Sequence, residues 1–143
     1  MPYKYLDDMA TADVAFQATG KTREEMCRAA SDAVLNVMLA SFDDLVPRLS
    51  QKIFIQARDL EMLLFQFLQE LIFLKDAQKL LLRVTKVVIN ENVDGLTLRA
   101  EASGEEIDSH RHDLRVDIKA VTMHRFQVKA TDSGWEATVV LDI

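Results

Sequence analysis

Two aspartates near opposite ends of the chain have the type and position that best suit metal binding. Asp13 begins the stretch DVAFQAT, and Asp142 is the penultimate residue of the stretch WEATVVLDI. The period-2 pattern of each stretch places its aspartate opposite the apolar face of a strand. If the two strands are neighbours, both carboxylates lie at one sheet end, with the α-carboxylate of Ile143 beside them. Oxygen ligands of this kind suit calcium or magnesium.

A second interpretation of these acids stays open. Isolated acids at strand ends are usually turn formers, and acids at chain ends usually belong to solvated tails. Close carboxylates also repel each other unless a cation or a proton intervenes. Asp7 and Asp8 precede the first stretch and could add a further carboxylate. The apolar alternation of the last stretch continues through Ile143, which predicts that the terminus is held by burial.

The histidines give weaker signals. His110 and His112 share one face if HRH is extended, which a transition metal could use, but no third ligand accompanies them and surface positions are favoured. His124 shares a face with Phe126 and Val128, which favours a partly buried histidine over a catalytic one.

The remaining motifs argue against several kinds of functional site. The lone Cys27 excludes an intrachain disulfide and a zinc site built of cysteines. Gly20-Lys21-Thr22 resembles the end of a Walker A loop but lacks its upstream glycine. No nucleophile and base can be paired from the sequence.

The elements that position Asp13 and Asp142 follow from periodicity. Residues 22–39 and 59–76 carry apolar residues at helical spacing, with Thr22 and Glu25 as a capping box and Asp59 as an N-cap. The broad apolar stripe of the second helix is read as core, with a docking helix for a partner as the alternative. Strands are expected at 13–19, 51–57, 82–89, 96–102, 125–130 and 135–143, with turns at 90–95 and 131–134.

This order predicts an α+β fold in which two helices pack on one face of a mixed, largely antiparallel sheet, as a single two-layer domain over residues 1–143. The chain of 143 residues is long enough to bury a core without staples. No basic leader followed by a long apolar run is present, so we expect a cytoplasmic protein without a membrane segment.

The charge argues against a free-standing nucleic-acid binder. The formal net charge is −6, whereas such proteins usually carry a basic excess. The stretch 110–129 is locally basic, and a solvated strand face explains it. We therefore expect no direct stable nucleic-acid binding.

Three segments resemble the archease family. TADVAFQATGKTREEMCRAA is similar to the opening of that family, HDLRVDIKAVTMHRFQV to its central R-H-x-x-x-x-x-I-K-A-V-T-Y-H block, and GWEATVVLDI to its terminus. The resemblance runs over essentially the whole chain in the same order. Two positions depart from the pattern: Ala10 stands where the family commonly has a histidine before T-A-D, and Met123 stands in place of the tyrosine.

The resemblance implies a function and a site. It implies an archease-like domain that activates the tRNA-splicing RNA ligase, promoting its guanylylation and multiple turnover in tRNA splicing or RNA repair. It implies a divalent metal, calcium in the first instance, held by Asp13, Asp142 and the main-chain oxygen of Ile143. Asp8, Lys119 and His124 are expected near the metal or the ligase. A metal-dependent hydrolase and a chaperone-like binding module remain alternatives, and the exposed apolar face of a helix would mark the latter.

Overall fold

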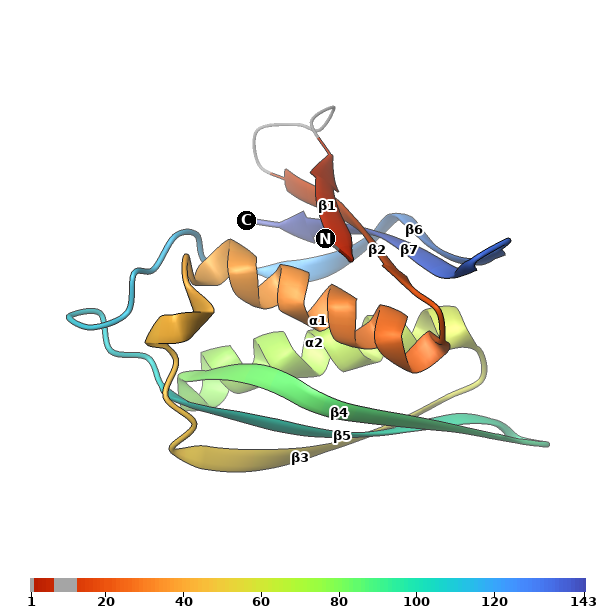
Figure 1. The fold of residues 1–143 in the computed structure, drawn as a ribbon, viewed down its shortest axis with the longest axis horizontal. Helices are drawn as coiled ribbons and strands as arrows, with labels where there is room; N and C mark the ends of the chain where they lie inside the picture. Colours follow the sequence, from red (N-terminus) through yellow and green to blue (C-terminus); the bar gives the residue numbers. More distant parts are fainter. Residues whose placement is uncertain (1, 7–12) are drawn as a thin grey trace.

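The computed structural model describes residues 2–6 and 13–143, and it places two helices between two β-sheets (Figure 1). The elements are β1 (Tyr3–Leu6), β2 (Asp13–Gly20), α1 (Arg23–Met38), a short 3-10 helix (Phe42–Asp44), β3 (Leu49–Ala57), α2 (Leu60–Gln78), β4 (Leu80–Asn92), β5 (Gly95–Glu106), β6 (Ala120–Thr131) and β7 (Gly134–Asp142). None of the helices in the described part of the chain has the length and apolar character needed to cross a membrane.

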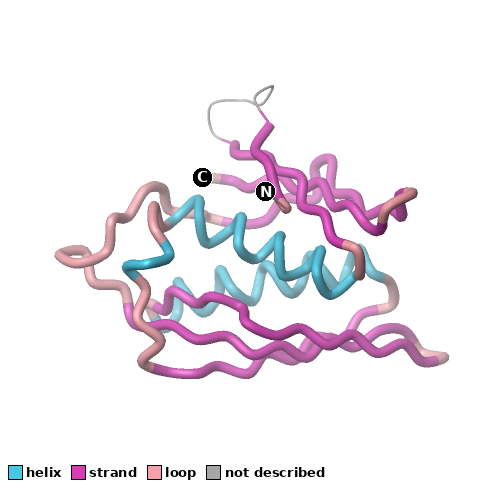
Figure 2. Tube along the Cα trace, in the orientation of Figure 1, coloured by secondary structure: helices cyan, strands magenta, loops and turns pink. Residues whose placement is uncertain are grey.

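The strands form two separate antiparallel sheets. One has the order β1-β2-β7-β6 and the other the order β3-β5-β4 (Figure 2). The predicted α+β class, with two helices and antiparallel strands, is confirmed. The arrangement differs from the prediction in one respect: there are three layers rather than two, because the strands are divided between two sheets that enclose the helices.

The burial of the helices explains the third layer. In α2 the buried side chains are Leu63, Leu64, Phe67, Leu68, Leu71, Ile72, Leu74 and Lys75, and α1 buries a still larger set. At 3.6 residues per turn these positions cover about half of the α2 surface or more. One sheet could cover only part of such a helix, so a second sheet is needed on the opposite side.

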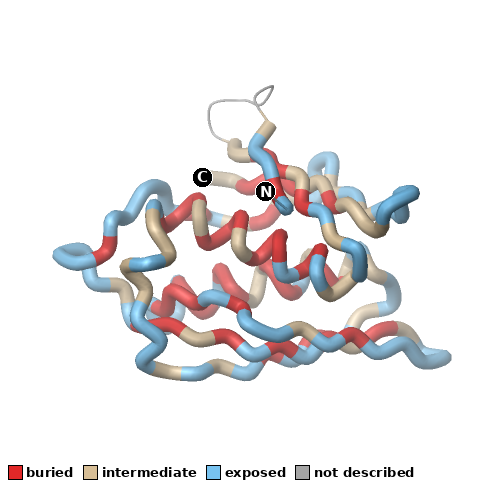
Figure 3. The backbone as a smooth tube through the Cα atoms, viewed as in Figure 1, coloured by how far each residue is buried: buried red, intermediate tan, exposed pale blue. Residues whose placement is uncertain are grey.

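A single hydrophobic cluster joins both sheets through the helices. Phe16 of β2, Phe67 of α2 and Leu98 of β5 are fully buried within it. Figure 3 shows the buried positions concentrated on the helices and recurring between exposed positions along the strands. The interpretation of the α2 stripe as core is therefore confirmed for most of its residues, with Phe73, at 58% exposure, as the exception.

Local hydrogen bonds fix where the helices begin. The Thr22 side chain accepts from the Glu25 N–H at 3.1 Å, and the Glu25 carboxylate accepts from the Lys21 N–H at 2.8 Å. The predicted cap is present, although Glu25 reaches Lys21 rather than the N–H of Thr22. The Asp59 side chain accepts from the Met62 N–H at 2.9 Å and caps α2 as predicted.

Two segments differ from the prediction. β1 was not expected, and it adds an edge strand beside β2. Residues 107–119, which include the HRH segment, form a loop between β5 and β6 rather than a strand face. This loop crosses the end of the helical layer, because Arg115 donates its N–H to the Met38 carbonyl at 2.8 Å.

Candidate functional site

Asp13 and Asp142 are direct partners on neighbouring antiparallel strands. The register of β2 and β7 pairs Asp13 with Asp142 and, one step inward, Val14 with Leu141. Leu141 is fully buried toward the helices, so the aspartates lie on the opposite, outer face of the sheet. Cβ atoms of directly opposed residues lie about 4.5–5.5 Å apart, which is close enough for two carboxylates to share one cation.

The chain terminus belongs to this site because it is packed. Val139 and Leu141 are fully buried, and half-buried Ile143 packs against the same core. The predicted burial of the apolar face is confirmed for Val139 and Leu141 and is partial at Ile143. The terminal carboxylate of Ile143 therefore follows Asp142 on a strand with a fixed position, instead of on a loose tail.

Lys119 lies at the same end of the sheet. Its backbone N–H donates to the Asp142 carbonyl at 2.8 Å, and the next residue, Ala120, pairs with Asp142 in register. The Lys119 side chain is exposed. Its backbone thus helps to fix the position of Asp142, while its ammonium group is left accessible to solvent or to a partner.

The residues before Lys119 are anchored on α2. Buried Lys75 donates to the Asp117 carboxylate at 2.6 Å and to the Ile118 carbonyl at 2.8 Å. Burial lowers the pKa of Lys75, but hydrogen bonds to Asp117 and Asp76 outweigh this effect, so the pKa is raised and the ammonium stays charged. A buried ammonium thus ties the loop that leads into β6 to the helical layer.

His124 occupies a different place from the one expected. It lies in a bulge of β6 between Thr122, which pairs with Val140, and Gln127, which pairs with Thr138. Arg125 in this bulge has a left-handed backbone with φ of 57°. The expected half-buried face with Phe126 and Val128 is wrong for His124, which is exposed, because the bulge breaks the strand alternation.

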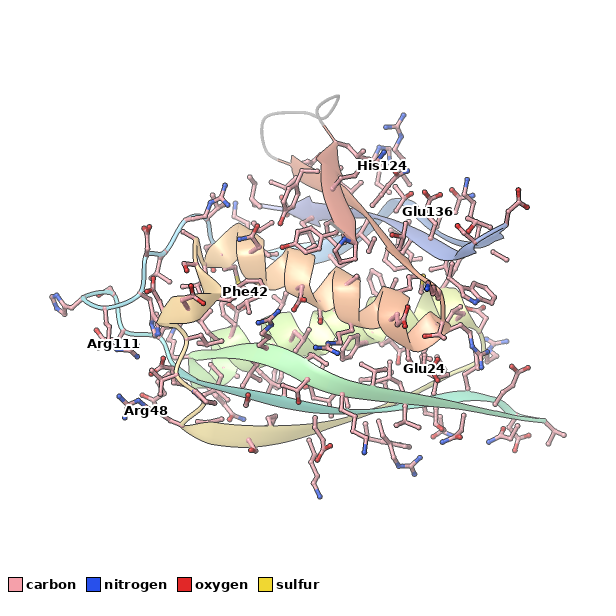
Figure 4. All side chains as sticks on the ribbon, in the orientation of Figure 1. Glu24, Phe42, Arg48, Arg111, His124 and Glu136 are labelled. Atoms are coloured by element: carbon pink, nitrogen blue, oxygen red, sulfur yellow. The ribbon has the colours of Figure 1, made fainter. Side chains whose placement is uncertain are left out.

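The structure does not bring His124 and Lys119 to one point. Lys119 precedes the pair formed by Ala120 and Asp142, whereas His124 follows Thr122 farther along β6. Figure 4 shows His124 on the side of this sheet that faces away from the helices. Asp8 and Ala10, like the rest of 7–12, lie outside the described residues.

The donor set fits a hard cation but does not complete its coordination. The sheet end offers the carboxylates of Asp13 and Asp142 and the terminal carboxylate of Ile143. Within residues 2–6 and 13–143, no group of three or more His, Cys, Asp or Glu side chains is placed to hold a metal. Calcium takes about 6–8 oxygen ligands. Further oxygens would have to come from water, from a partner, or from residues outside the described part.

A second polar cluster was missed by sequence reasoning. Glu105 is only 3% exposed and accepts from the Val46 N–H at 2.6 Å, from Arg48 Nε at 3.1 Å, and from Arg111. Figure 4 shows Arg48 and Arg111 near the same end of the molecule. The Arg111 hydrogen bond is the main reason why the pKa of Glu105 lies well below its usual range.

His112 completes this cluster and is buried, so the surface position favoured for it is wrong. Its Nδ1 accepts from the Asp108 N–H at 2.9 Å, and its Nε2 lies 3.0 Å from Glu105. Because Nδ1 accepts, Nε2 carries the proton and donates to the carboxylate. Strand alternation could not predict the burial of His112, because His112 lies in the 107–119 loop. This loop covers Glu105.

Known proteins match this chain over nearly its full length. Residues 3–143 match the model of the Archease protein family (MTH1598/TM1083). The protein archease of Methanosarcina barkeri is 37% identical over 142 residues, covering 99% of this chain and 95% of the relative. The protein archease of Thermococcus gammatolerans is 33% identical over 134 residues, covering 93% and 94% of the two chains.

Solved structures agree with these matches. The solution structure of Methanobacterium thermoautotrophicum protein 1598 has a TM-score of 0.86 and 34% identity, and the match covers 99% of each chain. The crystal structure of a Thermotoga maritima archease, named a possible chaperone, has a TM-score of 0.66 and 17% identity, with 96% of each chain covered. The second likeness concerns the fold alone.

Proposed function

Because the chain belongs to the archease family, we propose that it is an accessory protein that activates the tRNA-splicing RNA ligase, and not an enzyme itself. In this proposal it promotes guanylylation of the ligase and lets the ligase turn over repeatedly in tRNA splicing or RNA repair. The observation that carries the proposal is the pairing of Asp13 with Asp142 at an end of the sheet that the chain terminus helps to fix.

The charge of this end supports a contact with a basic cleft. Among the described residues, neither the Asp13 nor the Asp142 carboxylate forms an ion pair, so both remain available to a cation or a partner. Two opposed carboxylates and a terminal carboxylate give a locally negative tip. Such a tip favours encounter with a positively charged active site.

We further propose that Asp13, Asp142 and Ile143 hold a divalent cation, calcium in the first instance. A cation bound there supplies positive charge that offsets the repulsion between the carboxylates. The chain's own contribution is to fix the two acids on paired strands and to hold Asp142 through the hydrogen bond from Lys119. The exposed Lys119 and His124 side chains are then candidates for contacts with the ligase.

The test is ligation by the cognate RNA ligase, measured under single-turnover and multiple-turnover conditions with and without this protein. We expect the protein to raise both guanylylation and the number of turnovers, and we expect Asp142→Asn to abolish the effect. Asp132→Asn is the matched control, because it removes the same charge from an exposed turn between β6 and β7.

The same experiment separates the alternatives. A folded Asp142→Asn variant that still activates fully would contradict the role of the acid pair. Metal-dependent hydrolysis of RNA ends by the protein alone would favour a hydrolase. A chaperone-like module would be marked by an exposed apolar helix face, but most of the α2 stripe is buried between the sheets and Phe73 is its exposed member, at 58%.

A further inference from the structure

The outer face of the β3-β5-β4 sheet carries an ordered set of exposed side chains. Register places Phe54, Arg99 and Val88 in one row across the sheet. The next row consists of Lys52, Glu101 and Lys86. We call these six residues the basic face. Together with neighbouring backbone they line a shallow hollow of about 440 Å³.

This face exposes apolar surface that folding does not use. Phe54 is 54% exposed and Val88 is 38% exposed, although both sit in the middle of regular strands. The Arg99 guanidinium lies over the Phe54 ring, 4.8 Å from its centroid. An exposed aromatic ring stacked with an arginine offers flat π surfaces to a ligand, and it contributes little to the core.

The charge of the basic face is opposite to that of the whole chain. Lys52, Lys86 and Arg99 oppose the single acid Glu101, in a chain whose formal net charge is −6. Within residues 2–6 and 13–143, none of these three cations is among the ion-paired side chains. The acidic excess therefore lies elsewhere on the molecule, and this face is locally attractive to an anion.

We propose that the basic face binds single-stranded RNA. One unstacked base stacks on Phe54 and the Arg99 guanidinium, while Lys52 and Lys86 contact the neighbouring phosphates. Sheet faces that combine aromatic rings with cations recognise single strands in this way, because every base has a π face and every linkage a charge. An acidic peptide would satisfy the lysines but would not use the stacked ring and guanidinium.

This inference goes beyond the proposed function and does not depend on it. The basic face lies on the far side of the helices from the Asp13–Asp142 pair, as Figure 1 shows for the two sheets. The expectation of no stable nucleic-acid binding came from net charge, which averages over opposite faces. Three cations provide only weak, salt-sensitive binding, so the contact is transient in the isolated protein.

The test is fluorescence anisotropy with a fluorescein-labelled single-stranded RNA of about ten nucleotides, a length within the usual site sizes. The two phosphate contacts of Lys52 and Lys86 predict a slope of about −1.4 in a plot of log K against log salt concentration. Removing both contacts with Lys52→Ala and Lys86→Ala should bring the slope close to zero. Lys4→Ala, on the other sheet, removes one exposed charge and should leave affinity unchanged.

The aromatic ring gives a second, independent readout. Phe54→Ala should weaken binding by about 5-fold or more, whereas Phe54→Tyr keeps a stacking surface and should retain affinity. Amide chemical-shift changes on titration of the wild type with RNA should map to β3, β5 and β4. Thermal unfolding checks that each variant is folded.

Several results would overturn the proposal. They are no binding at low salt, shifts that map to the other sheet, or equal binding by folded Phe54→Ala. Tighter binding of a polyglutamate peptide than of RNA would assign the face to an acidic protein segment instead. None of these results bears on ligase activation, which is measured separately with Asp142→Asn.

Discussion

Asp13 and Asp142, from opposite ends of the chain, face each other in register across β2 and β7. Antiparallel pairing places their side chains on one face, so each carboxylate carries the electrostatic cost of the other. The Asp142 backbone is held by Lys119 on its other side, and half-buried Ile143 packs against the core. The two acids therefore cannot separate without disrupting paired strands. Their fixed proximity should affect both the stability of the protein and its response to calcium.

Replacing either acid should uncouple stability from calcium. Without metal, Asp13→Asn and Asp142→Asn should change the free energy of unfolding by no more than about 0.5 kcal/mol, or raise it slightly, because repulsion is relieved. Calcium should raise the melting temperature of the wild type, since a ligand that binds only the folded state stabilises it. Thermal unfolding with and without calcium measures both effects.

The control for this experiment is Asp132→Asn, which should respond to calcium as the wild type does. An equal shift of melting temperature in Asp142→Asn would show that the cation binds elsewhere. No shift in the wild type at millimolar calcium would mean that the isolated protein lacks the proposed metal site.

Lys119 should matter for ligase activation and not for folding. Lys119→Ala leaves intact the backbone hydrogen bond to Asp142 and removes only an exposed ammonium. The free energy of unfolding should therefore change by no more than about 0.5 kcal/mol, as for surface substitutions generally, while stimulation of the ligase falls. Unchanged stimulation would mean that Lys119 has only a structural role, and Lys129→Ala, on the strand β6 that follows Lys119, serves as the comparison.

Sequence patterns predicted those parts of the fold that depend on local periodicity. The α2 stripe, the Thr22 cap and the outer-face position of the two aspartates follow from helical and strand repeats. The division into two sheets does not, because alternation shows which side of a strand is apolar but not which strand lies beside it. Helices that bury side chains over so much of their surface were the available signal for two covering layers.

The positions of His124, Glu105 and His112 could not be predicted, because they depend on a bulge and on a loop and not on periodicity. His124 lost its expected partners because a bulge in β6 shifts the alternation at Arg125. Glu105 and His112 are buried by a loop with no periodic pattern of its own. Such burial depends on tertiary contacts, which a single sequence does not display.

The residue after α2 offers a test of backbone strain. Lys79 caps the helix in the left-handed region, with φ of 59° and ψ of 35°, and its N–H donates to the Leu74 carbonyl. Glycine adopts this conformation without the steric cost of a Cβ atom. Lys79→Gly should therefore stabilise the protein by about 0.5 kcal/mol in chemical denaturation, after allowance for the more flexible unfolded chain.

Lys79→Ala separates this effect from the loss of charge. Alanine removes the ammonium but keeps the Cβ atom, so it should give no stabilisation. If alanine and glycine had the same effect, the strain argument at this position would fail.

The buried Glu105 cluster should determine how the protein responds to acid. The pKa of Glu105 is lowered from its usual value of 4.5, chiefly by the Arg111 hydrogen bond, so the folded state favours the carboxylate more than the unfolded state does. This stabilisation is complete above pH 4.5 and is lost as the pH falls toward the lowered pKa. Glu105→Gln should lower the free energy of unfolding by about 3 kcal/mol at neutral pH. This value is at the low end for a broken buried ion pair, because Arg48 and Arg111 remain partly solvated.

The direction of this pH dependence is tested by denaturant unfolding between neutral and acidic pH, with the wild type, Glu105→Gln and Glu106→Gln. The stability difference between the wild type and Glu105→Gln should shrink as the pH falls, because acid protonates the wild-type carboxylate and removes the same interaction. Glu106 is the exposed neighbour, and its variant should follow the wild type at every pH. A difference that stays constant down to the lowest pH at which the fold persists would mean that packing of the Glu105 side chain, and not its charge, holds the 107–119 loop in place.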